Sequence, residues 1–509
     1  MLSKVKSYAL CGIEGYMVDI EVDLRAGVPA FDIVGLPSSS IKESRNRVQA
    51  AIKNNGYQFK GKRVTINLAP ADTKKDGSYF DFPIAIGFLI SSYQLPSKIF
   101  QDYIMIGELS LDGNLRKVNG VMPILISALQ SGYKKFIIPY ENRKEASYIR
   151  DIEVIAVKSL FEACNFLSGL EDVKPIDAQD YVIDNTKMDY QLDFCNVKGQ
   201  PLAKRAMEIA VAGGHNILLN GPPGTGKTML AKCVPSIMPK LNFSEAIEIT
   251  KIHSIAGILD SNVGIVYTRP FRNPHHTASE YSLTGGGSKA TPGEVSLAHN
   301  GVLFLDEMPE YQRKTLETLR QPLEDGVIII SRVARTVEYP AKFMLIASMN
   351  PCPCGNLGSE NLECTCSARE IRSYHSKISG PLLDRIDISV SVDNIEYDDL
   401  RSKSNLETSA VIKERVEKAR KTQNDRFAND GIYTNSEMLS EQLEKYCAID
   451  KESDILLHQA FKRLNLSARA TIRILKTART IADLDNSPNI ELKHLAEAIQ
   501  FRAYERKEV

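Results

Sequence analysis

One eight-residue segment constrains this 509-residue chain more than any other. Gly221-Pro-Pro-Gly-Thr-Gly-Lys-Thr228 fits the pattern G-x-x-x-x-G-K-[ST], follows a strand-like apolar run at 216–220, and leads into a segment that can form a helix. In that order, backbone N–H groups can surround phosphate oxygens while the lysine reaches the outer phosphates. The alternative is an ordinary Gly-Pro turn before a helix. The predicted nucleotide-binding residues are Gly221, Pro222, Pro223, Gly224, Thr225, Gly226, Lys227 and Thr228.

A second segment supplies the acids that such a site needs. Gly301-Val-Leu-Phe-Leu-Asp-Glu307 is an apolar strand that ends in two carboxylates, and burying carboxylates is costly unless a cation or a catalytic role compensates. We expect Asp306 and the Thr228 hydroxyl to hold Mg²⁺, and Glu307 to act as the base for the attacking water. A helix-capping acid would explain only one of the two. Together the segments predict hydrolysis of ATP with Mg²⁺ as cofactor.

The pattern along the chain predicts an α/β protein of several domains. Residues 1–168 mix short β-rich runs with helical segments, which indicates an α+β domain, and residues 169–190 form an acidic linker. Residues 191–393 alternate apolar strands with helices, as expected for a doubly wound parallel sheet. Residues 394–509 show only helical spacing, which predicts an all-α domain.

Composition limits where a polyanion could bind. Sixty-three Lys and Arg balance sixty-three Asp and Glu, so the formal net charge is zero and any polyanion site must be local. The most apolar stretch, 82–90, is far shorter than the ~18 residues that a membrane span needs. We read no signal peptide, and nine cysteines without a targeting signal indicate a reducing, cytoplasmic setting with no membrane partner.

These motifs resemble the AAA+ ATPases and, more narrowly, the magnesium-chelatase-like ComM/YifB family, across essentially the whole chain. The segments that carry the narrower resemblance are Arg269–His276, Pro292–Gly301, Leu319–Gly326 and Ser379–Asp387. The resemblance implies a sensor-1 role for Asn350 beside the γ-phosphate. It also implies that Arg385 is an arginine finger reaching a neighbour's nucleotide, that Arg469 is the sensor-2 arginine of a helical lid, and that the protein forms a ring, a homo-hexamer. The alternative for Arg385 is an ion pair within the chain, with Asp384 or Asp387.

The amino-terminal domain resembles the proteolytic domain of Lon. Val64–Asp72, Lys74–Gly77 and Gly107–Gly113 are similar to Lon segments, but the place of the catalytic serine holds Tyr79 and that of the lysine holds Met122. Methionine cannot take a proton, and a phenol with no lysine beside it is not activated. We therefore expect a scaffold or ligand-binding domain without protease activity, the alternative being a shifted dyad that uses Ser78.

Two polar insertions are candidates for DNA contact. A Gly-rich stretch between Lys251 and Glu294 carries Arg269 and Arg272, and a predicted hairpin at 326–342 carries Arg332 and Arg335. In the resembled family both elements project toward the pore of the ring, where arginines could grip phosphates without any overall positive charge. The alternative is a solvated hairpin with ordinary surface charge.

Four of the nine cysteines are crowded into fifteen residues. Cys352, Cys354, Cys364 and Cys366 form a C-x-C, nine-residue, C-x-C pattern. Four thiolates can hold a structural Zn²⁺ tetrahedrally, although this spacing differs from the usual C-x-x-C. Structural zinc and four free thiols remain the two interpretations.

The leading functional hypothesis rests on the resemblance. It is a ring-forming AAA+ ATPase that couples ATP hydrolysis to DNA translocation and branch migration in recombination during natural transformation, acting on single-stranded or branched DNA through a central pore and alongside recombination proteins. The alternatives are a chelatase-type ATPase and a protein-remodelling ATPase that acts on a protein partner. Against the chelatase stand the Lon-like domain and the absence of an integrin-like region.

Overall fold

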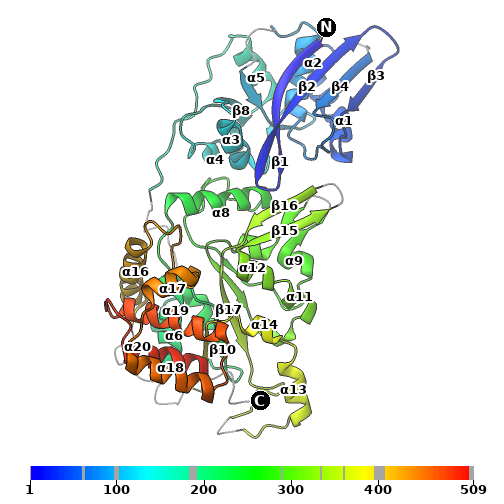
Figure 1. The fold of residues 1–509 in the computed structure, drawn as a ribbon. Helices are drawn as coiled ribbons and strands as arrows, with labels where there is room; N and C mark the ends of the chain where they lie inside the picture. Colours follow the sequence, from blue (N-terminus) through cyan, green and yellow to red (C-terminus); the bar gives the residue numbers. More distant parts are fainter. Residues whose placement is uncertain are drawn as a thin grey trace.

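The computed structural model describes residues 2–59, 63–96, 102–182, 192–287, 290–332, 335–358, 362–394 and 407–503, with only the backbone described at residues 332, 335 and 503. The molecule is elongated, with the amino-terminal domain at one end and the nucleotide-binding core and helical domain at the other (Figure 1). This architecture confirms the predicted α/β fold class with a helical carboxy-terminal region. Within the described residues, every helix is too short or too polar to cross a bilayer.

The amino-terminal domain is built on a mixed sheet of order β3-β4-β2-β1-β5-β8-β9. Two long antiparallel strands form its spine, and their side chains alternate between a buried face and a more exposed face, as a sheet covered on one side requires. The elements are β1 (Leu2–Cys11), β2 (Glu14–Arg25), β3 (Ala30–Val34), α1 (Ser39–Asn54), β4 (Arg63–Ala69), α2 (Asp81–Ser91), β5 (Tyr103–Met105), β6 (Glu108–Leu109), β7 (Leu115–Arg116), α3 (Val121–Gln130), β8 (Lys135–Pro139), α4 (Arg143–Ala146), β9 (Glu153–Val157) and α5 (Leu160–Leu167).

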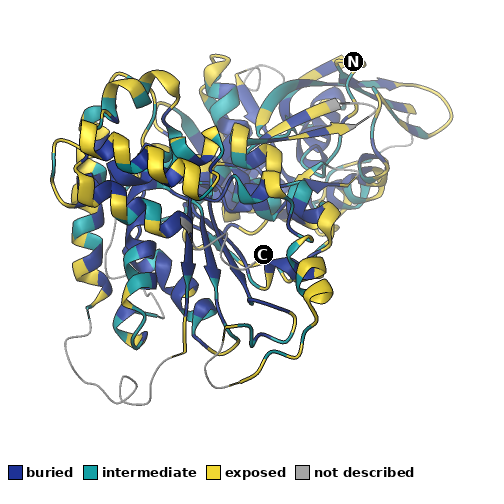
Figure 2. Cartoon of the chain, turned by 60° about the horizontal axis from the view of Figure 1, so that its bottom comes forward, coloured by how far each residue is buried: buried dark blue, intermediate teal, exposed yellow. Residues whose placement is uncertain are grey.

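The nucleotide-binding core is a five-stranded parallel sheet of order β11-β14-β17-β10-β18. Its central strands are buried on both faces, which their continuous apolar sequences predict (Figure 2). The elements are α6 (Pro201–Gly213), β10 (Ile217–Asn220), α7 (Lys227–Ile237), α8 (Phe243–Ala256), β11 (Phe271–Arg272), α9 (Glu280–Thr284), β12 (Gly285–Gly286), β13 (Thr291–Pro292), α10 (Glu294–Leu297), β14 (Val302–Leu305), α11 (Arg313–Glu317), α12 (Arg320–Asp325), β15 (Val327–Arg332), β16 (Arg335–Pro340), β17 (Met344–Met349), α13 (Ala368–His375), α14 (Gly380–Leu383) and β18 (Ile388–Ser391).

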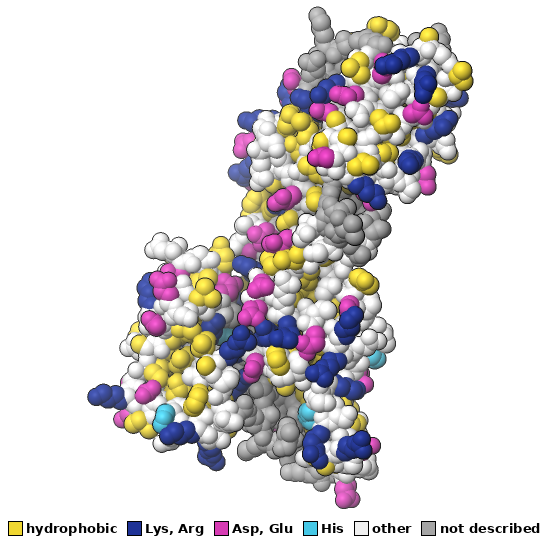
Figure 3. Space-filling view, turned by 45° about the vertical axis from the view of Figure 1, so that its right-hand side comes forward, with side chains coloured by type: hydrophobic (Ala, Val, Ile, Leu, Met, Phe, Trp, Pro, Cys, Tyr) yellow, Lys and Arg dark blue, Asp and Glu magenta, His cyan; other side chains and the backbone are white. Residues whose placement is uncertain are grey.

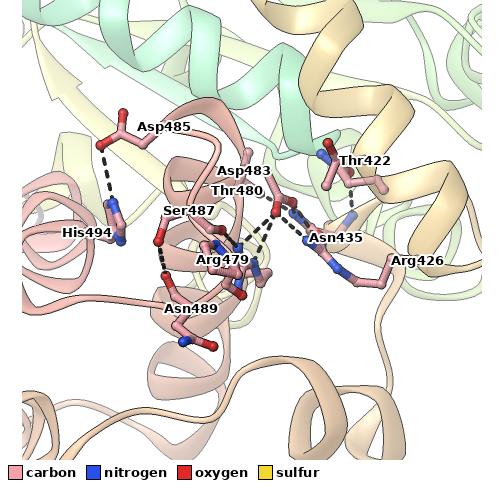
Figure 4. Close-up of polar contacts among 12 residues, drawn as sticks. Thr422, Arg426, Asn435, Arg479, Thr480, Asp483, Asp485, Ser487, Asn489 and His494 are labelled. Atoms are coloured by element: carbon pink, nitrogen blue, oxygen red, sulfur yellow. Dashed lines mark hydrogen bonds and ion pairs between the residues drawn. The ribbon is translucent and has the colours of Figure 1, made fainter.

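The carboxy-terminal domain is helical and shares a hydrophobic cluster with α6 and α7 of the core. A buried carboxylate ties it together: Asp483 accepts hydrogen bonds from Arg426, Asn435 and Arg479 (Figure 4). Because a buried charge is stable only when fully paired, this network fixes how the helices pack. The helices are α16 (Ser409–Arg426), α17 (Ser440–Tyr446), α18 (Lys451–Arg463), α19 (Ala468–Leu484) and α20 (Leu492–Ala503).

Helix α8 joins the amino-terminal domain to the core. It lies between the two (Figure 1) and shares one hydrophobic cluster with α3, including Met122, Leu125, Ala246 and Ile249. The fully buried carboxylate of Glu145 accepts hydrogen bonds from the backbone N–H of Met122 in α3 and from the hydroxyl of Ser254 in α8. The domains are therefore packed through a continuous apolar and hydrogen-bonded joint.

The segment predicted as an acidic linker also contacts this joint, as far as it is described. The N–H of Ile176 donates to Val154 O, and the ring of Tyr181 stacks on Tyr267 with centroids 5.6 Å apart. Residues 169–182 contain no helix or strand. They nevertheless lie against the protein surface, and residues 183–191 lie outside the described part.

Candidate active site

The loop between β10 and α7 has the shape that phosphate binding needs. Only glycine fits at position 221, because a Cβ there would lie 2.1 Å from the backbone oxygen of Val392, the residue after β18. Gly226 has φ +91°, which favours glycine, and a Cβ built on it would meet no atom within 4 Å. The loop therefore leaves open space in front of the α7 N-terminus, where a phosphate group gains from the helix dipole.

Lys227 occupies the centre of this loop. Its Nζ donates to Gly221 O at 2.5 Å, to Pro222 O at 2.7 Å and to Asn350 Oδ1 at 3.2 Å. Burial lowers the pKa of Lys227 to about 8, because a desolvated ammonium is less stable than a hydrated one. The predicted phosphate lysine and the predicted sensor residue thus meet, although 123 positions separate them, because β10 and β17 are neighbouring parallel strands.

The magnesium ligands predicted from sequence also lie together. The Thr228 hydroxyl donates to Asp306 Oδ2 at 2.9 Å, and Ser348 on β17 donates to the other carboxylate oxygen. A hydroxyl and a carboxylate beside the phosphate loop form an oxygen donor set, which suits Mg²⁺. When bound, Mg²⁺ would neutralise developing charge on the β- and γ-phosphates. Ser348 was missed in the sequence; only its place at the end of an apolar strand could have indicated it.

Glu307 lies one residue beyond Asp306 in an uncommon backbone conformation. Its φ and ψ are 51° and 49°, in the left-handed region, and its N–H donates to Ser348 Oγ at 3.0 Å. The side chain is 55% exposed, and its Oε2 lies 3.8 Å from His276 Nδ1. A half-exposed carboxylate at the mouth of the phosphate loop has the chemistry expected of a base for water.

Arg385 and Arg469 lie at the opposite edge of the sheet. The backbone oxygen of Arg385 accepts a hydrogen bond from Asn216, which lies just before β10. The phosphate loop follows β10 at its other end, and the four residues of this strand span about 13 Å. Both arginine side chains pair with one carboxylate, that of Glu324 on α12. The hydrogen bond from Arg385 lowers the pKa of Glu324.

This placement decides which nucleotide the two arginines could contact. Arg385 pairs with Glu324 and not with Asp384 or Asp387; Asp387 instead pairs with Arg473 of α19. The polar contacts of the two arginine side chains are with Glu324 and, for Arg385, also with Pro381 O. Glu324 was missed in the sequence analysis because a carboxylate on a short helix carries no local signal.

Arg269 and Arg272 make internal ion pairs. Arg269 contacts Glu245, Pro239 O and Asn300 O, and its side chain is 13% exposed. Arg272 donates twice to Glu294, at 2.6 and 2.8 Å. In this arrangement both guanidinium groups brace the insertion, and we leave them out of the DNA contacts proposed below.

The first insertion contacts two other parts of the chain. Its first half, residues 257–267, contacts the amino-terminal domain: Lys117 donates to Leu259 O at 2.8 Å and Lys144 to Asn262 O at 2.6 Å. Its second half contacts the hairpin, where Tyr339 donates to Ala290 O at 2.8 Å. Residues 257–267 therefore contribute to the domain joint.

The second insertion forms the predicted hairpin. Strands β15 and β16 pair antiparallel, and Arg332 lies opposite Arg335 at the end of the ladder. Their side chains lie outside the described part of the structure. Charged residues of both signs are interspersed over the face shown in Figure 3, which agrees with zero net charge.

The four clustered cysteines converge after β17. Sγ of Cys364 lies 3.7 Å from those of Cys352 and Cys354, which are 3.3 Å apart, and all four sulfurs lie within 4.8 Å of one another. Backbone N–H groups of Cys354 and Leu357 donate to Cys366 and Cys352 sulfurs. The same loop touches the phosphate loop, since a Cβ on Gly355 would lie 2.5 Å from Pro223 Cδ.

The positions that correspond to the Lon dyad are occupied by packing residues. Met122 is fully buried in the cluster shared with α8. Burial raises the pKa of the Tyr79 hydroxyl well above its usual value. The domain joint therefore covers the place where a catalytic lysine would stand.

Comparison with known proteins finds similarity along the whole chain. The family described as "Magnesium chelatase, subunit ChlI" matches residues 193–400, "Subunit ChlI of Mg-chelatase" matches 20–142, and "Magnesium chelatase, subunit ChlI C-terminal" matches 406–502.

Individual relatives cover the same extent. The competence protein ComM of Haemophilus influenzae is 42% identical over 511 residues, covering 99% of this chain and 98% of that protein. The uncharacterized protein YifB of Escherichia coli is 41% identical over 510 residues, again covering 99% and 98%. Lon protease 2 of Bacillus subtilis is 32% identical over 165 residues, 29% of each protein, in the amino-terminal region.

Proposed function

Because this chain belongs to the ComM/YifB family of magnesium-chelatase-like AAA+ ATPases, we propose that it forms a hexameric ring coupling ATP hydrolysis to DNA translocation and branch migration during natural transformation. Family membership implies the ATPase activity with ATP and Mg²⁺. The DNA substrate, the ring and the role in recombination are the proposed part.

The observation that carries the proposal is the position of Arg385 and Arg469. Both pair with Glu324 at the edge of the sheet opposite the phosphate loop of their own chain. Arginines that stabilise the transition state of phosphoryl transfer can be supplied in trans. Arginines in this position suit contact with a nucleotide of the next copy, and such head-to-tail contacts form a ring when the rotation between copies closes.

DNA as the substrate is supported by the hairpin and by the named relative. Arg332 and Arg335 are paired across the hairpin at the last position of its ladder, so two cationic residues lie at one end of the hairpin. Paired arginines can hold a phosphate backbone while the rest of a neutral surface does not attract it. The relative that is 42% identical is named as a competence protein.

The test is ATP turnover without DNA, with single-stranded DNA and with a DNA fork. We expect the fork to stimulate turnover, and the variant Arg332→Ala/Arg335→Ala to lose most of the stimulation while keeping its basal rate. Lys421→Ala/Lys451→Ala, which removes two cationic residues elsewhere, is the matched control. If no DNA binds or stimulates turnover, the DNA part of the proposal is wrong.

A chelatase-type or protein-remodelling ATPase is the second candidate, favoured by the three family descriptions. It predicts stimulation by a protein partner and none by DNA, so the same assay separates the two.

We also propose that the four-cysteine cluster binds a structural Zn²⁺. Tetrahedral Zn²⁺ with Zn–S bonds of about 2.3 Å separates its sulfurs by about 3.8 Å, whereas a disulfide brings them to about 2 Å. The observed sulfur–sulfur separations of 3.3 and 3.7 Å are closer to the first value. N–H groups that donate to two of the sulfurs would stabilise thiolates, as they do around bound metals.

A further inference from the structure

Asn350 begins the loop that follows β17, and this loop is held on both sides. Before it, Met349 O accepts a hydrogen bond from the N–H of Gly221 at 3.2 Å, which ties the end of β17 to the phosphate loop. After it, the buried side chain of Cys352 joins the four-cysteine cluster. Only Pro351 lies between Asn350 and this cluster. The backbone of Pro351 therefore helps to set where the Asn350 side chain points.

His375 is the side chain that holds Pro351. Its Nε2 lies 3.0 Å from Pro351 O, and because a carbonyl oxygen can only accept, the imidazole donates from a protonated Nε2. His375 is the last residue of α13, 24 positions further along the chain. Its side chain is only partly buried, so its removal opens no closed cavity. One hydrogen bond thus links α13 to the residue next to Asn350.

Helix α13 is itself anchored to the core. It begins with a capping box directly after Cys366, so it continues from the cysteine cluster without a break. Tyr374 in the helix and Ile378 just after it are buried in the same apolar cluster as Met349. The helix lies at the end of the molecule away from the amino-terminal domain (Figure 1). His375 is therefore fixed relative to the end of β17.

The side chain of Asn350 points into the nucleotide site. Its Oδ1 accepts from Lys227 Nζ at 3.2 Å, which leaves the amide NH₂ group to donate elsewhere. A carboxamide beside the phosphate lysine can orient a γ-phosphate oxygen or a water only while its own backbone stays in place. A displacement of about 1 Å is enough to slow a reaction that depends on such alignment.

We propose that His375 is a positioning residue for ATP hydrolysis that acts through Asn350. The imidazole fixes the carbonyl of Pro351, and this carbonyl fixes the loop that holds the Asn350 amide toward the nucleotide site. His375 forms and breaks no covalent bond. The inference rests on the proposed function for the ATPase activity and for the role of Asn350 in it, and is independent of DNA as the substrate.

The test is ATP turnover of His375→Ala in the full chain without DNA, together with ATP binding measured by titration. We expect kcat to fall about five- to tenfold, since a misplacement of about 1 Å can slow a reaction by up to about a hundredfold. The Kd for ATP should stay at the wild-type value, because the phosphate loop is unchanged. His458→Ala, which removes an exposed histidine of α18, is the matched control and should keep the wild-type rate.

Two further variants separate positioning from packing. In His375→Gln, the amide nitrogen can donate to Pro351 O in place of Nε2, so kcat should return to within about twofold of the wild type. In an Asn350→Ala background, His375→Ala should lower kcat no further, because its effect passes through Asn350.

Three outcomes overturn the proposal: an unchanged kcat in His375→Ala, a loss of ATP binding as large as the loss of kcat, or an additive loss in the double variant. A wild type without ATP turnover overturns it as well, together with the proposed ATPase. If DNA fails to stimulate the wild type, only the DNA part of the proposed function is wrong, so the two failures are distinguishable.

Discussion

The ammonium group of Lys227 donates a hydrogen bond to the side-chain oxygen of Asn350, so the phosphate loop and the end of the neighbouring strand share one contact. The other two acceptors of Lys227 are carbonyls of its own loop. An incoming phosphate must replace these neutral acceptors with charged oxygens.

That replacement predicts proton uptake when ATP binds at alkaline pH. Burial lowers the pKa of Lys227 to about 8, and phosphate oxygens should raise it because they stabilise the ammonium form. ATP affinity should therefore fall as pH rises above about 8. Calorimetry at about pH 8.5 in two buffers of different ionisation enthalpy measures the uptake. Lys227→Arg, which stays charged, should bind without it, and equal heats for the wild type in both buffers would exclude this pKa.

The pairing of Arg385 and Arg469 with Glu324 predicts complementation between inactive subunits. Arg385→Ala and Lys227→Ala should each lose most ATP turnover when assayed alone. When the two variants are mixed in equal amounts, about a quarter of the sites should be active. These are the sites in which an intact phosphate loop lies next to a neighbour that has Arg385. A mixture as inactive as its two components would place the arginine on its own chain's nucleotide.

The cysteine cluster predicts one zinc ion per chain in purified protein. Cys364→Ser should lower the zinc content and, because Gly355 packs on Pro223, weaken ATP binding as well. Elemental analysis and nucleotide titration check both effects. Cys195→Ser, which changes a cysteine outside the cluster, is the control. The wild-type protein should be purified once with added zinc and once without. If neither preparation contains zinc, four free thiols are the correct interpretation.

The burial of Glu145 predicts that the stability of the domain joint depends on pH. Its burial raises the pKa of the carboxyl, which hydrogen bonds from Ser254 and Met122 only partly offset. A raised folded-state pKa contributes stability below the unfolded pKa, and this contribution is lost as pH rises through the folded value. The thermal midpoint of Glu145→Gln should therefore fall less than that of the wild type between about pH 5 and about pH 8.

A second variant separates charge from hydrogen bonding at the joint. Glu145→Ala leaves the Met122 N–H and Ser254 hydroxyl without their acceptor and should cost about 3 kcal/mol of stability at about pH 5. Parallel pH profiles for the wild type and Glu145→Gln would show that the carboxyl titrates normally.

The nucleotide site could be predicted because its residues form contiguous motifs. Gly221–Thr228 and Gly301–Glu307 each lie at a strand end, and parallel pairing brings the strand ends to one edge. Asn350 followed from the family resemblance, and its side-chain oxygen accepts a hydrogen bond from Lys227. These inferences needed only local pattern and the topology of a parallel sheet.

The contacts between distant segments could not be predicted. Arg269 sits in a polar insertion, yet Glu245 and two carbonyls surround it, and nothing local marks these partners. Strand β11 has two residues, too few for any periodicity, so the approach of His276 to Glu307 was not visible. Likewise, packing of residues 257–267 on the amino-terminal domain depends on surfaces that form only after folding.

The most direct test of the proposed function is ATP-driven displacement of a labelled strand from a forked DNA by the purified full chain. We predict displacement that requires ATP and Mg²⁺ and that Lys227→Ala abolishes. ATP hydrolysis without any displacement or branch migration, on forked or four-way DNA, would contradict a DNA motor and leave a protein-remodelling ATPase.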